Sequence, residues 1–393
     1  MSYTVLARKY RSRTFDDIVG QEAIATTLKN AVTRGRVHHG YLFTGTRGVG
    51  KTSMARILAK ALNCLASDAP TPAPCGECEL CVAVAEGRDI DVIEIDAASN
   101  TGVDNIRELR SNTIYRPARA RYKVYIIDEV HMLSQGAFNA LLKTLEEPPD
   151  HVKFIFATTE PQRVPATIQS RCQRFDFRSI GVDRIAAHLE QILAAEGVRA
   201  EQAVVRRIAR LANGSMRDAL SLLDQLLSLG ADPLRVELID EILPTPHDEL
   251  LAELVDRLAD GDPAGALVAL DRSLSEGHSL EQFCGSLIDY LRELMVIRVC
   301  GPKTELVDVP APVRERLAGQ AERFDPTSFT YMITVVEELR RSVRFSGAGR
   351  TLTEAALIRL ASMERFSDVE AILAALDTPV SYTHLTLPTI YSV

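Results

Sequence analysis

The chain has 393 residues, 25% of them charged, and a net charge of −8, which indicates a globular protein of two or three domains. It has no run of about 18 apolar residues, and its first residues lack the apolar core of a secretory signal, so a membrane-spanning or secreted protein is not expected. With a cytoplasmic location as the default, we expect the seven cysteines to be metal ligands or core residues rather than disulfides.

The charge is distributed unevenly along the chain. Residues 1–60 carry eleven Lys/Arg and three Asp/Glu, a charge of +8, so the remainder carries −16. A second basic run extends over Arg107–Lys123. This pattern is compatible with a phosphate-rich partner on one face, although an ordinary solvated surface explains it equally well.

Residues 1–180 alternate between strand and helix patterns. Four short apolar runs, at 40–43, 91–95, 124–127 and 154–157, predict strands, and helical spacing lies between them. Buried strands separated by helices predict an α/β core in which a mainly parallel sheet is covered on both sides.

From about residue 181 the pattern becomes helical. Segments 185–195, 203–211 and 216–229 have helical apolar spacing, and Ser215 is placed to cap the third. A further all-helical section follows Leu243-Pro244. We therefore expect an α/β core at 1–180, a small all-α domain at 181–243, a second all-α domain at 244–365 and a tail at 366–393.

The last thirteen residues, SYTHLTLPTIYSV, contain no Asp, Glu, Lys or Arg and continue no helical pattern. We expect this segment to be non-native.

A phosphate-binding loop follows the first predicted strand. The spacing Gly45-x4-Gly50-Lys51-Thr52 fits this motif in full. Backbone N–H groups of the loop and the start of the next helix would surround the phosphates of ATP, Lys51 would reach the β- and γ-phosphates, and Thr52 would hold Mg²⁺. The expected nucleotide contacts here are Gly45, Arg47, Gly48, Val49, Gly50, Lys51, Thr52 and Ser53.

Two adjacent carboxylates end the third predicted strand, in Val124-Tyr125-Ile126-Ile127-Asp128-Glu129. Asp128 would fix Mg²⁺, and Glu129 would polarise the attacking water. A small-molecule kinase has a similar loop, but the Asp-Glu pair favours a hydrolase that couples ATP to motion. We expect His131 to have a packing or local hydrogen-bonding role and not to act as a base.

Four cysteines fall within eighteen residues, in the pattern Cys64-x10-Cys75-x2-Cys78-x2-Cys81. Four thiolates suit tetrahedral Zn²⁺ and leave no open coordination position, so this spacing predicts a structural zinc site. Reactive or buried free thiols are the alternative. The separate Cys172, Cys284 and Cys300 are expected to be core residues.

Taken in order, these motifs resemble a known family. The phosphate loop, the four-cysteine insertion, "VYIIDEVHMLS", "FNALLKTLEEPP", "FATTEPQRVPATIQSRC" and "GSMRDALSLLDQ" are similar to the gamma/tau family of bacterial DNA polymerase III, the AAA+ ATPases of the replicative clamp loader. The similarity covers about residues 3–365. It implies an AAA+ core, a helical lid and a helical collar that joins five subunits.

The resemblance also implies roles for single residues. Thr159 matches the first sensor, Arg171 the arginine finger that enters a neighbouring subunit's site, and Arg217 the second sensor on the lid. In this family the opening segment lines the adenine and ribose, which assigns that contact to Arg8, Tyr10, Arg11, Val19 and Gly20.

The partners implied are the delta and delta prime subunits, further copies of the chain, the sliding clamp and primed DNA. Arg107 and Lys143 are candidate DNA contacts on helices expected to face the central chamber, whereas Asn100 and Gly102 offer no positive charge there. The implied enzyme is an ATPase within the DNA polymerase III holoenzyme, without a polymerase active site in this chain. Two alternatives remain open: a non-hydrolysing, stator-like loader subunit, and another AAA+ DNA motor.

Overall fold

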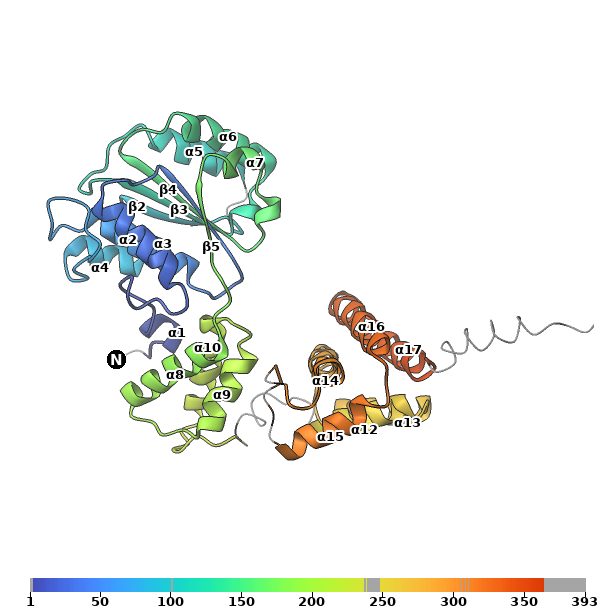
Figure 1. Ribbon diagram of the computed structural model, residues 1–393. Coiled ribbons are helices and arrows are strands. Elements are labelled where there is room, and N and C mark those ends of the chain that lie inside the picture. The colour runs from blue at the N-terminus through green and yellow to red at the C-terminus, as the bar shows by residue number, and fades with distance from the viewer. Residues whose placement is uncertain are drawn as a thin grey trace, which may run out of the picture. The chain divides into compact units, whose positions relative to one another are not determined.

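The computed structural model describes residues 3–99, 102–236, 238, 248–304, 306–307, 309 and 311–363 (Figure 1). The chain divides into two compact units, residues 1–242 and 243–393. Within the described ranges, no helix is both long enough and apolar enough to cross a bilayer. The expected tail at 366–393 and the expected boundary near residue 244 lie outside the described residues.

A parallel sheet of five strands forms the centre of the first unit, in the order β2-β3-β4-β1-β5. Its strands are β1 (Gly40–Thr44), β2 (Val92–Asp96), β3 (Lys123–Asp128), β4 (Val152–Thr158) and β5 (Gln173–Asp176). Each pairing is parallel, and β1 lies between β4 and β5. The four predicted strands are present, and every residue of β1 and β4 is buried.

The fifth strand was missed because its sequence lacks an apolar run. In Gln173-Arg174-Phe175-Asp176 only Phe175 is buried. The segment pairs with β1 along the edge of the sheet, with Leu42 opposite Arg174. Backbone pairing to a neighbour that is distant in sequence, rather than apolar burial, makes this segment a strand.

Helices cover both faces of the sheet, as predicted (Figure 1). One core cluster joins Tyr41, Phe43 and Ile126 to α2 (Glu22–Thr33), α3 (Lys51–Asn63) and α4 (Glu79–Glu86). The other cluster joins Tyr125, Phe154 and Phe156 to α5 (Val103–Asn112), α6 (Gln135–Glu146) and α7 (Ala166–Gln169). Because successive strand residues point to opposite faces, the apolar strands supply both layers of the core.

In the described part of the first unit, three helices follow the sheet along the chain: α8 (Val182–Glu196), α9 (Gln202–Leu211) and α10 (Met216–Ser228). The predicted cap of α10 is confirmed, since Ser215 Oγ accepts a hydrogen bond from Asp218 N. The short α1 (Leu6–Lys9) packs on this helical group through Leu6. Tyr10 Oη also donates to Glu196 at 2.6 Å, so the amino-terminal segment is held on the helical group.

The described part of the second unit is helical. It contains α12 (Asp248–Ala259), α13 (Pro263–Ser275), α14 (Leu280–Cys300), α15 (Ala311–Ala321), α16 (Pro326–Phe345) and α17 (Gly349–Ala361), packed around one apolar cluster. Cys284 is buried in that cluster, as predicted. The prediction for Cys300 is wrong: it is exposed because it is the last residue of α14, beyond the packed part of the helix. Cys172 is half-buried against the α6 side of the sheet, and burial raises its pKa to about 12.

Candidate functional site

The phosphate loop connects the end of β1 to the start of α3, as its motif requires. Gly48 and Gly50 have φ values of +77° and +100°, which favour glycine because they are left-handed. A Cβ on Gly48 would lie 1.9 Å from Ser215 Oγ. Arg217 N donates to Gly48 O at 3.4 Å. The absence of a side chain at Gly48 therefore lets the loop lie directly against the first turn of α10.

Lys51 is buried at the start of α3, and its Nζ donates to Gly45 O at 2.7 Å and to Thr46 O at 2.8 Å. Burial lowers its pKa, while Glu129 and Asp128 act in the opposite direction. The ammonium group is thus held inside the loop and faces two carboxylates. A phosphate entering the loop would replace carbonyl oxygens with a full negative charge.

The two predicted Mg²⁺ ligands lie in contact. Thr52 Oγ1 donates to Asp128 Oδ2 at 2.6 Å. Hydroxyl and carboxylate oxygens are ligands that Mg²⁺ accepts, usually together with phosphate oxygens and water. This pair fits such an ion, which would neutralise phosphate charge at the mouth of the loop.

Glu129 and Thr159 come from the ends of the neighbouring strands β3 and β4. Thr159 Oγ1 donates to Glu129 Oε2 at 3.2 Å. Glu129 has a φ of +46°, a left-handed conformation that is uncommon for a residue with a side chain. Such strain is concentrated at functional sites, where surrounding contacts hold it.

Lys51, Thr52, Asp128 and Glu129 line a cavity of about 760 Å³, a volume within the range of small-molecule sites. The predicted contacts that line it are Arg8, Tyr10, Arg11, Val19, Arg47, Gly48, Val49, Gly50, Lys51, Thr52, Ser53, Asp128, Glu129 and Arg217. In the described part of the chain, Gly20, Gly45, Thr159 and Arg171 are not among its lining residues.

Several positively charged side chains line this cavity, among them those of Arg8, Arg11, Arg56 and Arg217. Burial lowers the pKa of Arg11, and the nearby guanidinium groups of Arg56, Arg217 and Arg8 lower it further, against an opposing effect of Glu94. Arg56 is paired with Glu94, Nε to Oε2 at 2.7 Å. Cations that repel one another in a half-buried cavity are suited to a polyanionic ligand.

Arg171 lies away from this cavity, directly after α7. Its guanidinium donates to Glu146 Oε1 at 2.6 Å and to Thr167 O at 2.7 Å. The side chain is 32% exposed and that of Glu146 is 50% exposed. Within its own chain, Arg171 is therefore a surface group and does not line this cavity.

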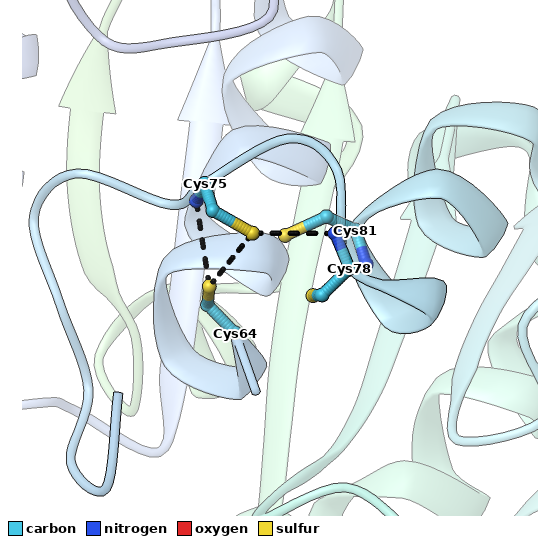
Figure 2. A group of neighbouring side chains, drawn as sticks. All are labelled: Cys64, Cys75, Cys78 and Cys81. Atoms are coloured by element: carbon cyan, nitrogen blue, oxygen red, sulfur yellow. Dashed lines mark hydrogen bonds between the residues drawn. The ribbon is translucent and has the colours of Figure 1, made fainter. Parts of the chain in front are cut away.

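The four cysteines of the predicted metal site come together, and Figure 2 shows their sulfur atoms turned toward one another. All four sulfurs lie within 4.8 Å of one another, and Cys64 Sγ is 3.6 Å from Cys75 Sγ. Tetrahedral zinc with Zn–S bonds of about 2.3 Å needs sulfur–sulfur separations of about 3.8 Å. The residues present therefore fit zinc.

Backbone groups orient these thiols. Cys75 N, Cys78 N and Cys81 N each donate to the sulfur of the preceding cysteine at 3.3–3.4 Å. Hydrogen bonds from the backbone of Cys78 and Glu77 lower the pKa of Cys75 to about 6, whereas burial raises that of Cys81. Amide donors that point at the sulfurs stabilise the thiolate form that a metal requires.

Sequence reasoning missed a segment that supports the cysteine module. Residues 118–122, which we call the strap, precede β3. Arg121 donates to Leu62 O, to Ser67 O and, at 2.9 Å, to Cys64 O. Arg119 bridges Glu79 and Asp89. The only signal in the sequence was the basic run itself, which gives no indication of these carbonyl partners.

A buried carboxylate holds the strap in place. Asp91 is 3% exposed and accepts hydrogen bonds from Ala118 N, Arg119 N and Ala120 N at 2.8–3.0 Å. Burial would raise its pKa, but these three donors hold it below the usual value. Asn63, fully buried at the end of α3, exchanges two hydrogen bonds with the backbone of Tyr122.

The candidate DNA contacts lie on neighbouring helices (Figure 1). Arg107 on α5 is 64% exposed and paired with Asp104 at 3.0 Å. Lys143 on α6 is exposed. Gly102 caps α5, and Asn100 lies outside the described residues.

Three family models match successive parts of the chain. The model for the DNA polymerase III delta subunit matches residues 20–181, that for the clamp loader subunit ATPase lid domain matches 184–232, and that for domain III of DNA polymerase III subunits gamma and tau matches 234–376. The first two fall within the first compact unit.

Curated relatives agree with these models. The tau subunit of DNA polymerase III from Bacillus subtilis is 43% identical over 92% of this chain and 63% of its own length. The Escherichia coli tau subunit is 56% identical over 58% of this chain and 36% of its own. The gamma/tau subunit of Mycobacterium tuberculosis is 41% identical over 94% and 64%. The chain spans less than two thirds of the length of each of these relatives.

A solved structure of the Thermotoga maritima RuvB branch-migration motor is similar over 68% of this chain and 85% of its own, with 21% identity and a TM-score of 0.45, a level that carries no information on function. The lid and domain III matches, together with the tau and gamma/tau relatives, give the conclusion: this chain belongs to the gamma/tau family of DNA polymerase III clamp-loader subunits.

Proposed function

We propose that this chain is the ATP-hydrolysing motor subunit of a bacterial replicative clamp loader, which uses ATP to place a sliding clamp on primed DNA. One observation carries the proposal. The cavity lined by Lys51, Thr52, Asp128 and Glu129 is also lined by Arg217, on the first turn of α10 in the helical lid. A nucleotide bound there would touch core and lid at once, so its binding and loss would change how they pack.

The chemistry assigned to each group follows from its position. Mg²⁺ held near Thr52 and Asp128 would neutralise phosphate charge. Lys51 and Arg217 would bind phosphate oxygens, and Glu129 would orient the attacking water with Thr159 beside it. The segment with Arg8, Tyr10, Arg11 and Val19 would hold the adenosine part. The intact set of hydrolytic residues argues against a stator-like subunit.

The position of Arg171 supports a site shared between subunits. It does not line the cavity of its own chain, and its guanidinium is held by Glu146 and the backbone of Thr167. We propose that in a ring with further copies and with the delta and delta prime subunits, this guanidinium enters the neighbour's site. ATP would favour the arrangement that grips the clamp, and hydrolysis would release it.

DNA would contact the exposed faces of α5 and α6. Arg107 and Lys143 are the proposed phosphate contacts, and such contacts are independent of base sequence.

The proposed function is tested by ATPase rates of the reconstituted complex with neither, one or both of clamp and primed DNA. Strong activation by both together supports clamp loading. A rate that is unchanged by clamp and DNA but raised by an unfolded protein would instead indicate a remodelling motor.

A further inference from the structure

His131 is buried next to Glu129, and the motif assigns it no catalytic part. It lies on η1 (Val130–Met132), two residues after Glu129, and is 8% exposed. Its Nδ1 lies 3.0 Å from Thr158 Oγ1 and 3.5 Å from Glu129 Oε2. The local hydrogen bond expected from sequence is therefore made to β4, directly beside the carboxylate proposed to orient water.

The other ring nitrogen is also occupied. His131 Nε2 lies 3.3 Å from Glu160 Oε1, an oxygen that also accepts from Arg163 at 3.1 Å. Glu160 N in turn donates to Thr158 Oγ1 at 3.0 Å. The imidazole is thus held between the turn after β3, which carries Glu129, and the end of β4.

If the imidazole is neutral, these partners determine which of its two nitrogens carries the proton. A carboxylate oxygen only accepts, so Nε2 carries the proton shared with Glu160. The hydroxyl of Thr158 already accepts from Glu160 N, and it donates to Nδ1. In this arrangement the ring fixes Thr158 and fills the space beside Glu129.

Glu129 needs such support because its backbone is in the left-handed region, with a φ of +46°. Strain of this kind costs about 1–3 kcal/mol and persists only where surrounding groups determine it. Thr159 and His131 both approach Oε2 of the carboxylate, from β4 and from η1. Together they limit the rotation of the side chain that faces the cavity.

We propose that His131 is a positioning residue for Glu129: the Nδ1 side of its ring, which contacts Thr158, holds the carboxylate in the orientation that directs the attacking water. This inference rests on the proposed ATP hydrolysis and assigns no proton transfer to His131. A displacement of about 1 Å in such a group lowers rates by about 10²-fold. Binding of ATP, which uses the phosphate loop and the lid, does not depend on this ring.

A matched pair of substitutions separates positioning from packing. In His131→Asn the amide oxygen takes the place of Nδ1, where it accepts the hydrogen bond from Thr158, and the contact with Glu160 is lost. In His131→Gln the amide nitrogen takes the place of Nε2, where it donates to Glu160, and the contacts near Glu129 are left unmade. His131→Leu removes both, and Arg163→Gln alters only the exposed partner of Glu160.

The experiment measures kcat in the reconstituted complex with clamp and primed DNA, together with the Kd of each variant for a fluorescent ATP analogue. We expect kcat to fall about 10- to 100-fold in the Leu and Gln variants, and to stay within about threefold of wild type in the Asn and Arg163→Gln variants. We expect Kd to stay within about twofold throughout.

Equal kcat values for the Asn and Gln variants would overturn the inference, as would a loss that appears in Kd rather than in kcat. The Asn–Gln comparison decides the matter even where the Leu variant does not fold. Absence of clamp- and DNA-activated turnover in the wild-type complex would refute the proposed function itself, and is therefore distinguishable from failure of the role of His131.

Discussion

Removing the guanidinium of Arg171 should abolish turnover while leaving the fold nearly unchanged. In the single chain its ion pair with Glu146 joins side chains that are 32% and 50% exposed. Such a pair contributes about 0–1 kcal/mol to stability. A guanidinium that stabilises a phosphoryl-transfer transition state is worth a factor of about 10³–10⁵, or about 4–7 kcal/mol. Arg171 can therefore leave Glu146 for a neighbour's triphosphate at small cost.

We expect Arg171→Ala to lower the kcat of the reconstituted complex about 10³-fold or more, to leave the Kd for ATP within about twofold, and to change the free energy of unfolding by no more than about 1 kcal/mol. The assay is steady-state ATP hydrolysis with clamp and primed DNA, with nucleotide binding and urea unfolding measured in parallel. Arg174→Ala, which removes a nearby exposed arginine on β5, is the matched control and should retain turnover. Normal turnover in a complex whose every copy carries Arg171→Ala would refute the assignment, as would full-rate hydrolysis by a protomer that cannot associate.

Three further outcomes follow from the structure. Protein purified without chelator should contain one zinc per chain by metal analysis, and Arg121→Met should lose it to a chelator at least several-fold faster, because the strap no longer holds Cys64 O. Asp91→Asn should lower the free energy of unfolding by about 2 kcal/mol or more at pH 7, because three buried N–H groups lose a charged acceptor. The pKa of Asp91 is depressed in the folded protein, so the stability that its carboxylate contributes is present above about pH 4 and is lost on acidification. The difference in unfolding free energy between wild type and Asp91→Asn should therefore shrink at low pH. Gly48→Ala should weaken ATP binding at least about tenfold, because its Cβ collides with Ser215 Oγ at a position with φ of +77°.

Each of these outcomes has its own control. Less than half an equivalent of zinc per chain would contradict the zinc site. Arg116→Met, on the same basic run, is the control for Arg121→Met, and equal rates of zinc release from these two variants would contradict the role of the strap. For Asp91, urea unfolding at pH 7 and pH 3 gives the two free energies, and a constant difference would contradict the linkage. Gly50→Ala lies in the same loop, with a φ of +100° and no atom within 4 Å of the added Cβ, and therefore separates backbone strain from collision with the lid. Equal effects of the two substitutions on ATP affinity would count against the collision.

The sequence alone determined those features that depend on residues close together along the chain. The phosphate loop is recognisable because three glycines, a lysine and a threonine at fixed spacing define one backbone path. Asp128 and Glu129 are recognisable because they end an apolar strand, and four cysteines within eighteen residues define a ligand set. The buried strands β1, β3 and β4 are predicted for a similar reason, because burial on both faces requires continuous apolar runs.

Tertiary structure decided what depends on partners distant in sequence. The strand β5 exists through pairing with β1, which its own residues do not indicate. From the sequence, Arg121 is indistinguishable from a solvated surface charge, whereas in the fold its guanidinium donates to the carbonyl oxygens of Leu62 and Cys64. His131 becomes a neighbour of both Glu129 and Glu160 only because β3 and β4 lie side by side. Each of these contacts joins segments that are separated along the chain. A local residue pattern does not indicate which distant segment will lie beside it in the fold.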